Sequence, residues 1–154
     1  MRLIGILCLL IFNSSFAQNY NVEAYNFHQS IVEAQQNIGK EVYYFNESAT
    51  DLNLKILKFE LNKSIVFIDS LKVYNNETTY YNAAKKLFAL YKELTENEYV
   101  QLLKIIEDPE LEFKDFKAKK QKIFDAMKVK MAKVYPAFNA AQEAYCKKYG
   151  MKLE

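Results

Sequence analysis

The sequence contains few of the residues that mark most recognisable functional sites. It has one histidine, two cysteines, three glycines, two prolines and no tryptophan among 154 residues. A single histidine excludes the dinuclear iron or manganese centres of helical bundles, which need a Glu-x-x-His pair on each of two helices. No Cys-x-x-Cys-His motif and no glycine-rich phosphate loop occurs, which excludes a c-type haem and the common nucleotide-binding motifs. The first hypothesis is therefore a protein without catalysis, metal or cofactor.

The chain also lacks an excess of one charge. It carries 21 Lys and Arg against 19 Asp and Glu, a net charge of +2. Nucleic-acid binders have a strongly basic composition, so no nucleic-acid partner is expected. A hydrophobic content of 51% excludes intrinsic disorder, and the length is that of one domain that forms its own core.

The first residues have the pattern of a secretory signal peptide. An apolar run from Leu3 to Phe12 follows Arg2, and Ser15 and Ala17 supply small residues before a cut after position 17. Ten apolar residues are too few to cross a bilayer as a helix, and no second run of that kind follows, so no stable membrane anchor is expected. We predict a signal peptide over 1–17, a folded domain over 18–154, and export to the periplasm or the cell surface.

Apolar residues recur at intervals of three and four, and helix-breaking residues are scarce, which predicts an all-α fold. The pattern indicates helices over 22–45, 51–76, 78–107 and 113–148, with a kink near Asn97 and another at Pro136. Short connections favour antiparallel neighbours. We predict an up-down-up-down four-helix bundle with a long kinked C-terminal helix.

Several polar or sulfur-containing residues occupy apolar seams of the predicted helices. His28 and Gln35 lie on the first seam, and Met127 and Met131 lie on the last. These four residues are candidates for holding a small apolar ligand or a haem in the core. The alternative is that Gln35 fixes helix register, the methionines fill gaps, and His28 is a partly exposed residue near the end of the bundle. A nucleophilic pair of Cys146 and His28 is not favoured, because no third residue is in place to orient it.

Two sets of residues are candidates for a partner surface. Lys119, Lys122, Lys130 and Lys133 lie opposite the apolar stripe of the last predicted helix, whereas 92–112 carries seven acidic residues and two lysines. Such a basic face either recruits an acidic partner or is simply solvated. Adjacent aromatics in Tyr43-Tyr44-Phe45 and Tyr80-Tyr81 cannot all face inward, which makes Tyr44 and Tyr81 candidate contact residues.

Spaced segments along the chain resemble a family of small exported helical surface proteins of Gram-negative bacteria. They are Phe16-Ala17-Gln18, the region from Tyr25-Asn26 to Ile38, the region from Leu87-Phe88 to Tyr99, and the ending from Ala144-Tyr145-Cys146 to Glu154. The resemblance implies a four-helix bundle in the envelope and brings no catalytic residues. We therefore expect a non-catalytic binding or structural module, monomeric or weakly homo-oligomeric, whose partner is an envelope protein or polymer. The alternative is a carrier of an apolar ligand or haem.

Overall fold

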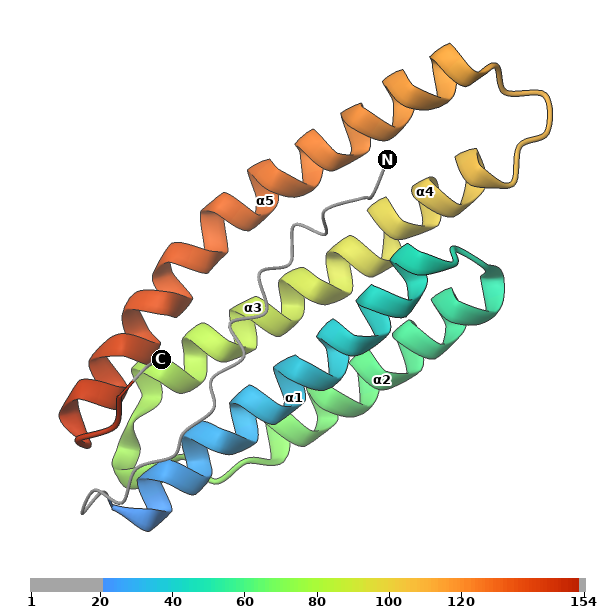
Figure 1. Ribbon diagram of the computed structural model, residues 1–154. Helices are drawn as coiled ribbons and strands as arrows, with labels where there is room; N and C mark the ends of the chain where they lie inside the picture. Colours follow the sequence, from blue (N-terminus) through green and yellow to red (C-terminus); the bar gives the residue numbers. More distant parts are fainter. Residues whose placement is uncertain (1–20, 153–154) are drawn as a thin grey trace.

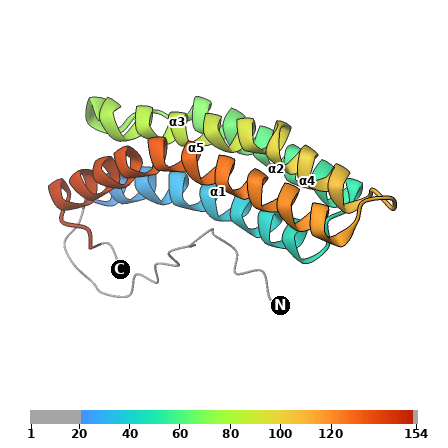
Figure 2. The ribbon, with the colours of Figure 1, turned by 90° about the horizontal axis from the view of Figure 1, so that it is seen from above.

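The computed structural model describes residues 21–152, which form helices and their connections without any strand (Figure 1). The helices are α1 (Val22–Glu47), α2 (Asp51–Ser70), the short 3₁₀ turn η1 (Tyr74–Asn76), α3 (Thr78–Glu96), α4 (Glu98–Ile106) and α5 (Phe113–Lys148). α3 and α4 continue each other as one rod, so four rods alternate in direction (Figures 1 and 2). The predicted all-α bundle with a long last helix is confirmed.

Local signals in the sequence explain where the helices begin and break. The side chains of Asn21 and Thr50 accept hydrogen bonds from the backbone N–H groups of Ala24 and Asn53, which satisfies donors left free in a first helical turn. The predicted kink near Asn97 is the break between α3 and α4, where the Asn97 amide donates to the Glu93 carbonyl at 2.9 Å. α5 continues through Pro136 as a single helix, as predicted.

The second helix is shorter than predicted. It ends at Ser70, and the chain is extended at Leu71 and Val73 before it enters the η1 turn. Asn75 and Asn76 have φ values of 46° and 59°, in the left-handed region that asparagine tolerates better than most residues. The prediction that the helix reaches this Asn-Asn pair is therefore wrong.

The predicted seams form most of the core. α2 contributes Leu54, Leu57, Leu61 and Ile68, and α3 contributes Tyr80, Ala84, Leu87, Tyr91 and Leu94. The stripe of α5 is buried only along part of its length: Ile123, Met127, Phe138 and Tyr145 are buried, whereas Phe113 is 70% exposed. This exposure follows from helix length, because the α4–α5 end projects beyond the loop that joins α1 to α2 (Figure 1).

The four rods are not equally close to one another. α1 packs on α2, α2 on α3, and the α3–α4 rod on α5, whereas the backbones of α1 and α5 make no comparable approach. Large side chains near the start of α1 and the end of α5 fill this wider gap. His28 of α1 and Cys146 of α5 are among them.

Candidate functional sites

A buried cluster of polar and aromatic side chains connects α1, α3 and α5. His28 is 9% exposed, and its Nδ1 lies 3.0 Å from the Tyr80 hydroxyl. The Cys146 Sγ lies 3.8 Å from His28 Nε2, although these two residues are 118 positions apart in the sequence. The expectation of a partly exposed His28 is therefore wrong. Sequence reasoning weighed Cys146 and His28 only as an unfavoured nucleophilic pair, and no local pattern could place the two side chains in contact.

Burial keeps every titratable group of this cluster uncharged near neutral pH. Desolvation lowers the pKa of His28 to about 4 and raises the pKa of Cys146 to about 11. Desolvation also raises the pKa of Tyr80 well above its usual value, although a hydrogen bond with the Gln142 side chain acts in the opposite direction. A thiol must be ionised to attack as a nucleophile, and Cys146 is 1% exposed. The arrangement brings Cys146 and His28 together without activating them.

The geometry of the cluster is that of a structural joint. The Tyr145 hydroxyl donates to the Ala24 carbonyl at 3.1 Å and so ties α5 to α1. The Tyr145 ring lies 5.0 Å from the Tyr80 ring and 5.7 Å from the Phe27 ring, measured between centroids. Contacts between aromatic rings at such distances stabilise cores beyond the area that they bury. These side chains close the space that the wider separation of α1 and α5 leaves at this end.

The predicted ligand residues do not converge on one site. Gln35 donates to the Tyr91 hydroxyl at 3.2 Å, and the Tyr135 hydroxyl donates to the same oxygen at 3.0 Å. Met127 and Met131 line a cavity of about 30 Å³ together with the same Tyr91 and with Ile38, Val42, Leu94, Thr95 and Tyr99. Ile38 is ten residues beyond His28, about 15 Å along α1, so neither methionine is placed opposite His28 as a second axial haem ligand. A cavity of that volume accommodates about one water molecule and no haem.

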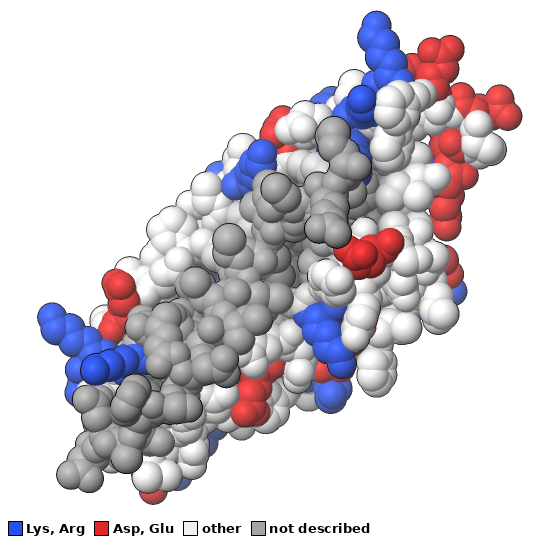
Figure 3. Space-filling model, in the orientation of Figure 1, with Lys and Arg blue, Asp and Glu red and all other residues white. Residues whose placement is uncertain are grey.

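The predicted basic face is divided by the tertiary structure. Lys130 lies 2.7 Å from both Glu93 and Glu98 and forms ion pairs that link α5 to the α3–α4 rod. Hydrogen bonds with Glu93 and then Glu98 raise the pKa of Lys130. Lys119, Lys122 and Lys133 are exposed. Acidic side chains gather at the same end of the molecule as lysines of α5 (Figure 3), so the two charges partly screen each other.

Tyr44 and Tyr81 lie at opposite ends of the bundle. Tyr44 is near the end of α1 and is 47% exposed, with the Lys40 amine 5.8 Å from its ring centroid. Tyr81 is near the start of α3, half-buried, and donates to the Asp69 carbonyl at 3.4 Å. The structure therefore gives these two tyrosines no common contact surface.

A surface that sequence reasoning missed runs along the outer side of α2. Five of its large apolar side chains are exposed by 41–70%: Leu52, Ile56, Phe59, Val66 and Phe67. We call this set the outer face of α2. Its centre lies about 150° around the helix from the buried seam, at 100° per residue. The signal was present in the sequence as the spacing of Leu52, Ile56 and Phe59 by four and three residues.

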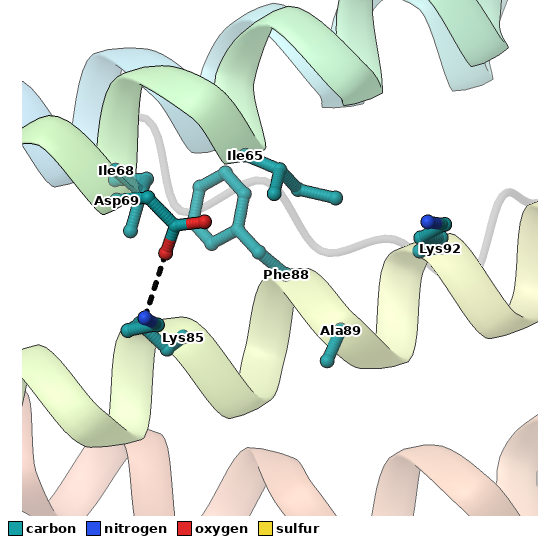
Figure 4. A pocket seen from close by; sticks show the side chains of 7 residues that line it. All are labelled: Ile65, Ile68, Asp69, Lys85, Phe88, Ala89 and Lys92. Atoms are coloured by element: carbon teal, nitrogen blue, oxygen red, sulfur yellow. Dashed lines mark ion pairs between the residues drawn. The ribbon is translucent and has the colours of Figure 1, made fainter.

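A shallow groove flanks this helix on the side of α3. It has a volume of about 220 Å³, and its apolar floor includes Ile65, Phe88 and Ala89. The Lys85 amine lies 2.7 Å from an Asp69 carboxylate oxygen across one end of the groove (Figure 4). None of the five side chains of the outer face of α2 lines this groove.

Comparisons with known proteins gave no match: no family model, no curated protein and no solved structure is similar to this chain. Within residues 21–152, no helix combines the length and the apolar character needed to cross a membrane. The same residues contain no group of three or more His, Cys, Asp or Glu side chains that could hold a metal ion.

Proposed function

We propose that this protein is a non-catalytic binding module of the bacterial envelope that docks protein partners on the outer face of α2. The export signal predicted over 1–17 and the family resemblance support the location; residues 1–17 lie outside the part that the structure describes. The observation that carries the binding role is a helix with two opposed apolar faces, of which only one is used by the bundle.

The size and pattern of the exposed surface support this role. Leu52, Phe59 and Val66 are each at least 65% exposed. Contiguous apolar patches above a few hundred Å² are uncommon on monomeric proteins and mark interaction sites. The positions 52, 56, 59, 63 and 66 follow the four-three spacing of a helix–helix seam, which suits a partner that presents a helix.

The other surfaces support binding less well. The basic end of α5 lies beside acidic residues, which weakens its attraction for an anionic polymer. The carrier alternative rests on His28, Gln35, Met127 and Met131, but His28 lies apart from the other three, and the cavity beside the methionines measures only about 30 Å³. Neither the basic face nor the core presents a continuous surface comparable with the outer face of α2.

Photo-cross-linking in the native host tests the proposal. A photo-reactive phenylalanine analogue replaces Phe59 in one variant and Phe113 in a matched control, because both side chains are 70% exposed. We expect a discrete protein adduct from position 59 and none of comparable yield from position 113. No adduct from position 59, or the same adducts from both positions, contradicts docking on α2. Recovery of the processed chain from the envelope fraction tests the location.

A further inference from the structure

We infer that the outer face of α2 binds the same face of a second copy of this chain, with the two α2 helices antiparallel across a two-fold axis near Leu61. This inference rests on the proposed binding role of α2 and names its partner. It is argued from the seam, its one charged residue and the exposed area.

The seam maps onto itself when α2 is reversed about Leu61. Under this operation position 52 faces position 70, position 56 faces position 66, and position 59 faces position 63. Ile56 then packs on Val66 of the second copy, and both are exposed in the single chain. Every contact occurs twice, as two-fold symmetry requires of a self-complementary interface.

Lys63 selects the antiparallel orientation. It is the only charged residue among the seam positions from 52 to 66; its side chain is 64% exposed, and its amine lies 3.2 Å from a Glu60 carboxylate oxygen of the same helix. In the antiparallel pair its amine meets the Phe59 ring of the second copy, a favourable cation–π arrangement. A parallel pair would place two Lys63 amines against each other, which repels.

The available area is that of a weak but specific dimer. The five exposed side chains of the outer face present on the order of 500 Å² of apolar surface, or about 1,000 Å² across two copies. Stable interfaces bury about 1,200–2,000 Å², so this total belongs to the weak class. We therefore expect a dissociation constant on the order of 10 µM, so that monomer and dimer coexist at ordinary concentrations.

Analytical ultracentrifugation of the protein purified from its host tests the association. We expect reversible dimers for the wild type and for Phe113→Lys, and at least about a hundredfold weaker association for Phe59→Lys, because position 59 would then present an ammonium to Lys63 of the second copy. A second matched pair tests whether the loss is confined to position 59. Val66→Glu lies on the outer face of α2 and should weaken the dimer, whereas Val129→Glu on α5 is its control; Val66 and Val129 are 69% and 58% exposed. A monomer at about 500 µM overturns the inference, and so does a dimer that Phe59→Lys leaves intact.

Disulfide trapping tests the orientation. A mixture of Leu52→Cys and Ser70→Cys chains should form a mixed disulfide, whereas Leu52→Cys alone should not, because its two thiols lie about 27 Å apart along antiparallel helices. Efficient cross-linking of Leu52→Cys to itself overturns the antiparallel arrangement.

The photo-adduct from position 59 separates this inference from the proposed function. An adduct with twice the mass of the processed chain supports the second copy. An adduct with a different protein, together with a monomer in ultracentrifugation, overturns the second copy but leaves docking on α2 in place. If neither an adduct nor a dimer is found, the second copy and docking on α2 are both contradicted.

Discussion

The cluster around His28 and the outer face of α2 differ in composition and in access. The cluster holds the histidine, the cysteine and several tyrosines, residue types that usually attract attention as functional. It is sealed, and its groups are uncharged near neutral pH. The outer face of α2 carries ordinary apolar side chains, yet solvent reaches all five of them. The difference teaches that access and ionisation, rather than residue type, decide which surface can act.

The largest expected effect is on the free energy of unfolding. It distinguishes a phenylalanine beside the buried cluster from one on the outer face of α2. Phe138→Ala should lower the free energy of unfolding by about 3–5 kcal/mol, because Phe138 is 2% exposed and its loss leaves a cavity beside Tyr80. Phe59→Ala should change it by no more than about 0.5 kcal/mol, because Phe59 contributes little to the core. Urea unfolding at low protein concentration, where the dimer is dissociated, measures both. A large loss in Phe59→Ala would mean that the outer face of α2 is part of the fold.

The next effect is the pH dependence that His28 imposes. Its pKa is lowered from 6.5 to about 4 in the folded protein, so the unfolded chain binds the proton more readily. Stability should therefore decrease as pH falls from about 6.5 toward 4, and the total loss from this group is about 3 kcal/mol.

Urea unfolding of the wild type and His28→Asn across this pH range isolates that contribution. Carboxylates titrate in both proteins, whereas only the wild type carries the imidazole. The stability difference between the two proteins should shrink as pH is lowered. Parallel curves would show that His28 takes up its proton in the folded protein without penalty.

The last prediction concerns the reactivity of the buried Cys146 thiol rather than the stability of the fold. Cys146 in the native protein should react with a thiol reagent at least about a hundredfold more slowly than in urea, because its pKa is raised to about 11 and the sulfur is buried. Ala144→Cys, two residues away and exposed, supplies a fast-reacting control in the same protein. Peptide mass spectrometry reads each site separately. Equal rates at 144 and 146 would show that the cluster is open to solvent.

Much of the fold could be predicted because helical spacing is a local property. The seams of α2 and α3, the break at Asn97 and the continuity of α5 through Pro136 all follow from residues within a few turns of each other. The end of α2 was misplaced because asparagine is polar enough to end a helix but also tolerates the left-handed turn that follows one.

The candidate sites were harder to predict because they depend on contacts between distant segments. Gln35 was expected to fix register, and its bond to Tyr91 is compatible with that role. His28 and Cys146 meet only because α1 and α5 are antiparallel, so no short motif announces the pair. The outer stripe of α2 was present in the spacing, but spacing does not tell which of two apolar faces the bundle buries.

The sequence by itself determined the helices, their order and most core residues, because backbone hydrogen bonding and apolar periodicity act over a few residues. The tertiary structure alone decided which titratable groups lost their water and which apolar face kept its contact with solvent. Both outcomes follow from how the rods pack: the joint at one end of α1 and α5 desolvates His28 and Cys146, while α2 is packed against α1 and α3, and no other helix within residues 21–152 covers its second face.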